Sequence, residues 1–247
     1  MRLSGKLAIV TGASRGLGAA QARALAREGA AILLCDLLDE RGRETVAAIA
    51  AAGGEATYQR LDVTSEAGWA AAVPAALRWK GRVDVLVNNA GINIRAGIAA
   101  TSLADWERVF AVNVTGALLG MRAAAPAMRE GGGGSIVNIA SAAALRASAS
   151  AAYTASKWAL RGLTKVAALE YASWKIRANT VCPGVVPTDL NAGQAYVQTV
   201  IEKIPLARNC TPEEVASVVV FLASADSAFV TGADVPVDGG LTVGSTR

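Results

Sequence analysis

The chain has no histidine among its 247 residues, so the side chain that most often carries protons in enzymes is absent. Tyrosine, lysine, carboxylate or cysteine must therefore perform any proton transfer. The three cysteines, Cys35, Cys182 and Cys210, are far apart in the sequence. Without histidine they cannot complete a zinc site, so no metal is predicted and we interpret them as free buried thiols.

Long uncharged apolar runs and clusters of basic residues are also missing. Arg or Asp interrupts every candidate for a membrane-spanning run, and Met1 to Lys6 lacks the apolar region of a signal peptide. We therefore expect a cytoplasmic protein that does not enter a membrane. The net charge of +4 comes from scattered basic residues, which argues against nucleic acid as a partner but suits an anionic cofactor.

Hydrophobic residues make up 53% of the chain, aromatic residues only 5%, and alanine and glycine dominate. This composition favours close packing of helices on a buried parallel sheet. The length suits one large α/β domain over residues 1–247. Strand-like and helix-like segments alternate throughout, which predicts a doubly wound parallel sheet of about seven strands with helices on both faces.

The expected elements can be placed by residue number. We expect strands at 7–11, 31–36, 57–61, 83–87, 135–141, 176–182 and 234–237, and helices up to about 28, over 39–52, 64–79, 102–130 and 151–174, and from about 189 and 211. Thr211, Pro212 and Glu214 predict a capping box with proline at the first helical position.

The first strand leads into a glycine-rich turn, Gly12-Ala-Ser-Arg-Gly16-Leu-Gly18, and then into a helix. This order is the context of a dinucleotide-binding turn, although the spacing is G-x-x-x-G-x-G. Glycines allow a tight turn and a close backbone approach, and the helix N-terminus offers N–H groups to a pyrophosphate. An ordinary glycine-rich turn is the alternative.

Asp36 ends the second strand, where a carboxylate can accept hydrogen bonds from the adenosine ribose and repel a 2′-phosphate. It could instead merely start the turn before the next helix. Arg15 favours NADP instead, because a guanidinium in the turn could hold the 2′-phosphate. Leu37 stands where a second basic residue would be expected for a phosphate clamp, so we predict NAD in preference to NADP.

Chemically distinctive residues follow the first six strands, namely Gly12, Asp36, Asp62, Asn89, Ser141 and Gly184. In an open α/β sheet these strand ends share one edge, where ligands bind. On the helix after the fifth strand, Tyr153 and Lys157 are four residues apart and share one face. A neighbouring ammonium lowers the pKa of a phenol from about 10, which would make Tyr153 an acid/base catalyst. Alone, the pair would also fit a solvated surface.

Together these residues closely resemble the short-chain dehydrogenase/reductase family over essentially the whole chain. The resemblance is carried by Thr11-Gly12-x-x-x-Gly16-x-Gly18, Asp62-Val63, Asn88-Asn89-Ala90-Gly91, Asn113, Ser141, Tyr153-x-x-x-Lys157, Pro183-Gly184 and Val237-Asp238-Gly239-Gly240. It implies a Rossmann-type fold and a homo-oligomer, commonly a tetramer. Each motif is weak alone, but eight in family order are specific.

The resemblance also implies roles for four residues. Tyr153 would exchange a proton with the substrate while hydride moves between substrate carbon and nicotinamide. Ser141 would hydrogen-bond the substrate oxygen. Lys157 would lower the pKa of Tyr153 and hold the nicotinamide ribose, and Asn113 would position a water on a proton path.

Cofactor contacts implied by the resemblance are Gly12, Ser14, Arg15, Gly16, Leu17, Gly18, Asp36, Leu37, Asp62, Val63, Asn89, Ala90, Gly91, Tyr153, Lys157, Pro183, Gly184, Val186 and Thr188. Substrate contacts are expected from Ser141, Ala143, Tyr153, Gly184 and Val185. This lining is mostly small and apolar, without an obvious charge for a carboxylate. It favours an uncharged alcohol or ketone, cyclic or hydroxysteroid-like.

The expected activity is therefore an NAD(H)-dependent interconversion of a secondary alcohol and a ketone, similar to that of bacterial hydroxysteroid and secondary-alcohol dehydrogenases. A 3-oxoacyl-[acyl-carrier-protein] reductase is the first alternative, although NAD preference argues against it. A non-catalytic NAD-binding regulator on the same fold is the second. Such a regulator would be expected to lose the proton-transfer residues.

Overall fold

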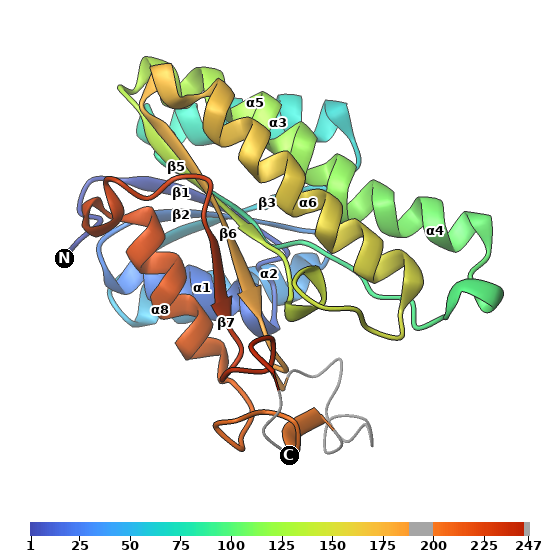
Figure 1. The fold of residues 1–247 in the computed structure, drawn as a ribbon. Helices are drawn as coiled ribbons and strands as arrows, with labels where there is room; N and C mark the ends of the chain where they lie inside the picture. The colour runs from blue at the N-terminus through green and yellow to red at the C-terminus, as the bar shows by residue number, and fades with distance from the viewer. Residues whose placement is uncertain (188–199, 245–247) are drawn as a thin grey trace.

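The computed structural model describes residues 1–187 and 200–244, and Figure 1 shows their arrangement. Seven parallel strands form one sheet in the order β3-β2-β1-β4-β5-β6-β7. The strands are β1 (Leu7–Thr11), β2 (Ala31–Asp36), β3 (Glu55–Arg60), β4 (Val85–Asn88), β5 (Gly134–Ile139), β6 (Ile176–Pro183) and β7 (Asp234–Val237). The strand order reverses between β1 and β4, and such a switch point is where doubly wound sheets bind ligands.

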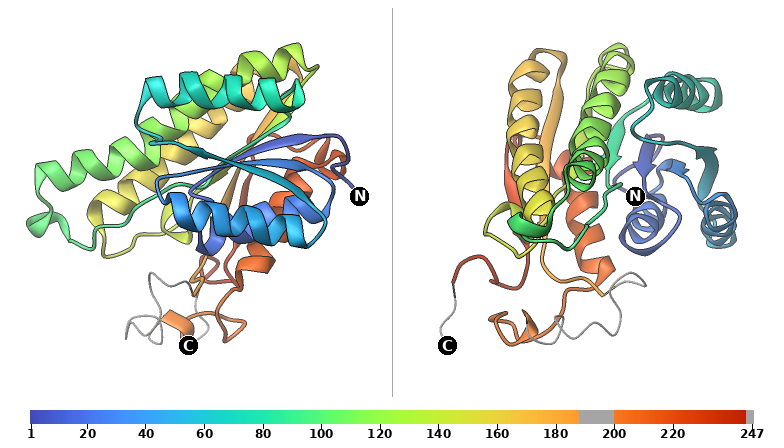
Figure 2. Two further views of the ribbon diagram at one scale, coloured as in Figure 1. Left: turned by 180° about the vertical axis from the view of Figure 1, so that it is seen from behind. Right: turned by 90° about the vertical axis from the view of Figure 1, so that its right-hand side faces the viewer.

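Helices cover both faces of the sheet. They are α1 (Gly16–Arg27), α2 (Asp39–Ala51), α3 (Glu66–Lys80), α4 (Leu103–Phe110), α5 (Gly116–Glu130), α6 (Ala151–Glu170) and α8 (Pro212–Ala223). In Figure 1 and in the reverse view of Figure 2, α1, α2 and α8 lie on one side of the sheet and α3, α5 and α6 on the other. The doubly wound α/β architecture predicted from the sequence is confirmed.

Strand β1 shows why the sheet needs two helical layers. All five of its residues are buried. Leu7 and Ile9 belong to the core cluster beneath α3 and α5, whereas Ala8 and Val10 belong to the cluster beneath α1 and α8. Successive side chains of a strand point to opposite faces, so a continuous apolar run is stable only when both faces are covered. Each large side chain buried there contributes roughly 1.5–3 kcal/mol.

Helix starts follow the local chemistry of the sequence. The Thr211 hydroxyl accepts the Glu214 N–H at 3.2 Å, and the Glu214 carboxylate accepts the Thr211 N–H at 2.8 Å, which confirms the predicted capping box. Ser65 and Ser102 accept N–H groups in the first turns of α3 and α4 in the same way. Helix α6 ends at Glu170 rather than continuing to Trp174, because residues Ala172–Trp174 form a separate 3-10 turn.

The long helix expected over residues 102–130 is interrupted. A π-helical turn at Ala111–Thr115 separates α4 from α5. The whole run Leu103–Glu130 is long and apolar enough to cross a membrane by length and composition, but half of its most apolar window is buried inside the protein. Its hydrophobicity is therefore accounted for by packing against α3 and α6.

Strand limits also differ from the sequence prediction. β3 begins at Glu55, two residues before the expected Thr57, because it pairs with the whole of β2 from Ala31 onward. β5 ends at Ile139, so Ser141 lies beyond the strand and begins a short 3-10 turn instead. The helix predicted from about residue 189 lies outside the described residues.

Candidate active site

The glycine turn after β1 presents backbone groups to the edge of the sheet. Gly16 has φ +54°, in the left-handed region that favours glycine. A Cβ on Gly18 would lie 2.1 Å from the Gly12 carbonyl oxygen, so a larger residue cannot fit without displacing the turn. No side chain caps the start of α1. The first N–H groups of this helix therefore remain available to an anion.

Asp36 is held in place by the backbone around it. Its Oδ2 accepts the Ser14 N–H at 2.9 Å, and its Oδ1 accepts the N–H groups of Leu37 and Leu38 at 2.7 and 3.1 Å. A carboxylate offers about four lone-pair sites, so roughly one remains for a ribose hydroxyl. The Ser14 hydroxyl donates to the Leu38 carbonyl at 3.1 Å and thus faces the protein. A contact between Ser14 and the cofactor stays a prediction.

The end of β4 is tied to the glycine turn. The Asn89 side-chain amide donates to the carbonyl oxygens of Thr11 and Gly12 at 3.0 and 3.1 Å. The Thr11 hydroxyl accepts the N–H groups of Asn89 and Ala90, both at 3.1 Å. These bonds fix the crevice between β1 and β4. Asn89 therefore shapes the crevice with its side chain, a role the sequence motif did not indicate.

Tyr153 and Lys157 lie on one face of α6, as their spacing predicts. The Lys157 Nζ is 5.6 Å from the centre of the Tyr153 ring and donates to the Ile139 carbonyl oxygen at 2.8 Å. Lys157 is only 4% exposed. Burial lowers the pKa of Lys157 from 10.5 to about 8, because a charged ammonium is poorly solvated there. The ammonium thus stands beside the phenol that it is expected to activate.

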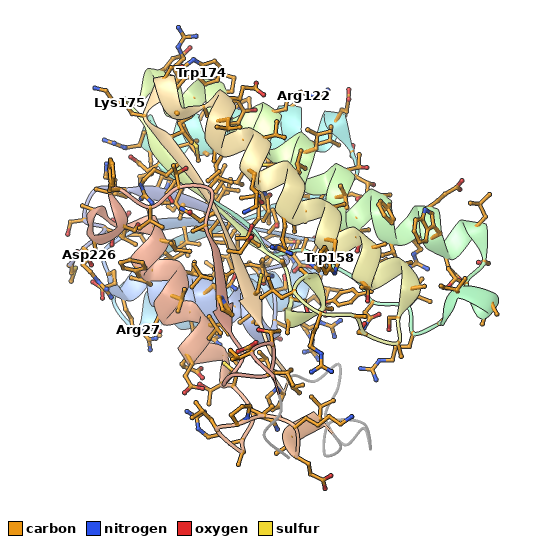
Figure 3. The ribbon with its side chains drawn as sticks, in the orientation of Figure 1. Arg27, Arg122, Trp158, Trp174, Lys175 and Asp226 are labelled. Carbon is orange, nitrogen blue, oxygen red and sulfur yellow. The ribbon has the colours of Figure 1, made fainter. Side chains whose placement is uncertain are left out.

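Ser141 stands at the turn that follows β5. Its Oγ accepts the Ala143 N–H at 3.1 Å, which leaves the hydroxyl proton able to donate to a substrate oxygen. The 3-10 turn Ala142–Ala144 that follows is anchored by Arg161 of α6, whose guanidinium donates to the Ala144 carbonyl at 2.5 Å and to Asp234 at 2.9 Å. Arg161 also packs over the ring of Trp158, which is labelled in Figure 3.

Asn113 occupies the π-helical turn and lies behind the cleft. Its Oδ1 accepts the Ile92 N–H at 2.8 Å, and its Nδ2 donates to the Ile92 carbonyl and the Ser156 hydroxyl, both at 3.0 Å. The widened turn aims this side chain between α6 and the segment after β4, and single π turns are frequent at functional sites. Asn113 therefore links the two segments that flank Lys157.

A single cleft of about 1900 Å³ collects these groups at the carboxyl edge of the sheet. Of the predicted site residues that the structure describes, all except Ser14 and Asn113 line it. The lining includes Gly12, Arg15, Gly16, Leu17, Gly18, Asp36, Leu37, Asp62, Val63, Asn89, Ala90, Gly91, Ser141, Ala143, Tyr153, Lys157, Pro183, Gly184, Val185 and Val186. Thr188 lies outside the described residues.

The cleft also contains basic side chains beyond the small, apolar residues expected to line the substrate site. Arg95, Arg108, Arg146 and Lys203 also line the cleft, and the predicted site residues include none of them. Their side chains come from loops and one helix, so no periodic pattern marks them. Two features of the sequence could have indicated basic residues in the cleft. One is the net positive charge, and the other is the position of Arg95 and Arg146, a few residues after Gly91 and Ser141 respectively.

Two of the cysteines are buried as expected. Cys35 and Cys182 are buried free thiols, and burial raises the pKa of Cys182 to about 11. Cys210 is free but only partly buried, which corrects the prediction for that residue. Within residues 1–187 and 200–244, no three His, Cys, Asp or Glu side chains come together as a metal-binding group.

Known proteins resemble this chain over nearly its whole length. The family model described as enoyl-(acyl carrier protein) reductase matches residues 12–242. The chain is 41% identical to trans-4-hydroxycyclohexanecarboxylate dehydrogenase of Sinomonas cyclohexanicum over 99% of this chain and 95% of the relative. It is 44% identical to 3-alpha-(or 20-beta)-hydroxysteroid dehydrogenase of Mycobacterium tuberculosis over 98% and 92% of the two chains.

Solved structures with the same fold also resemble this chain. A short-chain type dehydrogenase/reductase from Mycobacterium marinum superimposes with a TM-score of 0.94 at 36% identity, covering 97% of this chain and 96% of the other. The similarity extends over both halves of the sheet and therefore includes the cleft.

Proposed function

Because the chain belongs to the short-chain dehydrogenase/reductase family, we propose that it interconverts a cyclic secondary alcohol and the corresponding ketone, with NAD(H) as cofactor and Tyr153 as acid/base. The observation that carries this proposal is the buried Lys157 ammonium beside Tyr153, in the same cleft as the glycine turn and Ser141. The names of the relatives describe dehydrogenases of hydroxylated cyclic compounds, which favours an alcohol over an enoyl substrate.

The residues of the cleft fit a dinucleotide. The close approach of Gly18 to the Gly12 carbonyl and the uncapped start of α1 leave room and donors for a pyrophosphate. Asp36 retains acceptor capacity for a ribose hydroxyl. A bound nicotinamide would supply the hydride acceptor for alcohol oxidation, or the hydride donor for ketone reduction.

The side chains of the protein would manage the proton. In the oxidation direction, the Tyr153 phenolate accepts the hydroxyl proton of the alcohol as hydride leaves its carbinol carbon. The Lys157 ammonium favours the phenolate form of Tyr153 because it places a positive charge close to the ring. The Ser141 hydroxyl donates to the same substrate oxygen and orients it.

Turnover of cyclic alcohols tests the proposed activity. Purified protein is mixed with NAD⁺ and a panel containing cyclopentanol, cyclohexanol derivatives and hydroxysteroids, and NADH formation is followed by its absorbance. We expect the enzyme to oxidise at least one cyclic secondary alcohol. It should also reduce the matching ketone when NADH is supplied. Tight NAD⁺ binding without turnover of any alcohol or ketone would favour the non-catalytic regulator instead.

Removing the carboxylate of Asp36 tests the cofactor preference. In Asp36→Ala, the ratio of kcat/KM with NAD⁺ to that with NADP⁺ is expected to fall roughly tenfold or more, because repulsion of the 2′-phosphate is lost. Asp36→Asn is the matched variant, since it removes the charge but keeps an acceptor for the N–H groups of Leu37 and Leu38. An unchanged ratio in both variants would show that Arg15 or another residue sets the preference.

A further inference from the structure

Two carboxylates and three of the cations that line the cleft follow strands in opposite halves of the sheet. The lining carboxylates, among the described residues, are Asp36 after β2 and Asp62 after β3. Arg95 follows β4, Arg146 follows β5 and Lys203 follows β6. In the strand order β3-β2-β1-β4-β5-β6-β7, the acidic groups therefore occupy one end of the cleft and these three cations occupy the other.

The anionic groups of the cofactor do not account for these three cations. The pyrophosphate would lie at the start of α1, which follows β1, and a 2′-phosphate would lie near Asp36, after β2. The β4–β6 half of the cleft instead contains Ser141 and Tyr153, where the substrate reacts. A positive field in this half is thus directed at the substrate, and a cleft with low-dielectric walls focuses it.

Arg146 is fixed close to the reacting groups. Its backbone N–H donates to the Ala142 carbonyl at 3.1 Å, and its Nη1 donates to the Leu241 carbonyl at 3.2 Å. Leu241 lines the cleft and packs with Ala142, the residue next to Ser141. Within the described part of the chain, no carboxylate lies within ion-pair distance of Arg146, and its remaining N–H donors can bind a ligand.

Arg95 and Lys203 each stand next to a residue that contacts the catalytic segments. Ala96, the residue after Arg95, accepts the Ala151 N–H at 2.8 Å, two residues before Tyr153. Lys203 precedes Ile204, which packs against Ala142 and Leu241. All three basic residues are therefore held within a few residues of contacts to the catalytic segments, although they come from three different loops.

We propose that Arg146, supported by Arg95 and Lys203, forms an anion subsite that binds a carboxylate carried by the cyclic alcohol at a position away from its carbinol carbon. The inference rests on the proposed function and narrows its substrate to a hydroxylated alicyclic carboxylic acid or the corresponding keto acid. The guanidinium group suits this task because its planar fork matches the two oxygens of a carboxylate.

A matched pair of alcohols tests the subsite in the NAD-loaded enzyme. The probes are trans-4-hydroxycyclohexanecarboxylate and trans-4-methylcyclohexanol, which differ in the anionic group. Wild type is expected to have the higher kcat/KM for the carboxylate. Arg146→Gln should lower that value roughly tenfold to hundredfold, mostly through KM, and leave the neutral alcohol nearly unaffected, because a charge-assisted contact common to ground and transition states is lost. Arg146→Lys should recover part of the loss.

Arg78→Gln is the control, because Arg78 is an exposed residue on α3 outside the cleft and should alter neither substrate. A wild-type preference for the neutral alcohol, or an equal loss on both alcohols in Arg146→Gln, would overturn the subsite while leaving the proposed oxidation intact.

Binding of cyclohexanecarboxylate, which lacks a hydroxyl, separates the two proposals. Calorimetry on NAD-loaded protein should detect binding to wild type and roughly tenfold or weaker binding to Arg146→Gln. Such binding with no turnover of either alcohol would refute the proposed function and still support the anion subsite. Equal binding by both proteins, or no binding to wild type, would refute the subsite.

Discussion

Replacement of Tyr153 by phenylalanine is expected to lower kcat for alcohol oxidation roughly 10²–10⁴-fold, the usual contribution of general acid/base catalysis. The aromatic ring remains, so the packing of Lys157 against it is retained. With no histidine in the chain, a neighbouring imidazole cannot take over the proton. Steady-state kinetics with saturating cofactor measure the loss, and fluorescence titration with NADH should show cofactor binding close to that of wild type.

Tyr171→Phe provides the matched control at the residue that follows the same helix. Tyr171 lies at the end of α6 and stacks on Trp174 at a ring separation of 5.1 Å, outside the cleft. Loss of its hydroxyl should leave kcat within about twofold, because Tyr171 is remote from the cleft and its ring packing is kept. Near-wild-type turnover by Tyr153→Phe would remove the phenol from the proposed mechanism.

Replacement of Lys157 by methionine is expected to abolish most activity and at the same time stabilise the fold. Without the ammonium, Tyr153 loses the neighbouring positive charge that is proposed to favour its phenolate, and kcat should fall by more than about 10²-fold. The free energy of unfolding at pH 7 should rise by about 1–3 kcal/mol, because methionine removes a buried charge whose pKa is lowered to about 8. The lost bond to the Ile139 carbonyl offsets part of this gain.

The stability difference between wild type and Lys157→Met should depend on pH. Between pH 8 and 10.5 the unfolded Lys157 binds a proton that the folded one has already lost. The free energy of unfolding of wild type should therefore rise with pH across that window, whereas Lys157→Met lacks this contribution. Urea denaturation at pH 7 and pH 10 measures the difference, which should shrink as the pH rises.

The control for this pair of experiments is Lys80→Met, at a surface lysine that pairs with Glu55. Exposed ion pairs contribute little, so its stability should change by no more than about 1 kcal/mol at either pH. A destabilised Lys157→Met at pH 7 would show that the hydrogen bond to Ile139 outweighs the cost of burying the charge.

Much of the fold was predictable because its determinants are local. Continuous apolar runs such as Leu7–Thr11, the capping residues around Thr211 and the glycine turn each specify an element from neighbouring residues alone. The π turn at Ala111–Thr115 was missed, because a single extra residue in a helical turn leaves no change in composition or periodicity. The earlier start of β3 at Glu55 was also missed, since pairing with β2 decides it.

The candidate site divides in the same way. Tyr153 and Lys157 were placed correctly relative to each other because their helical spacing fixes which face they share. The inward-facing hydroxyl of Ser14 and the structural use of the Asn89 amide depend on partners far along the chain. Neither could be read from a motif, which records residue types and spacing but not the atoms that each side chain meets.

By itself, the sequence determined the family, the alternating order of strands and helices, and the helical face that Tyr153 and Lys157 share, because motif spacing and hydrophobic periodicity act within a few turns of chain. Only the tertiary structure decided which charged side chains line the cleft. Arg95, Arg146 and Lys203 come from three separate loops, and the strand order alone places them in one half of a cleft whose other half holds the carboxylates. Electrostatic character of this kind arises from distances between remote residues, which no linear pattern contains.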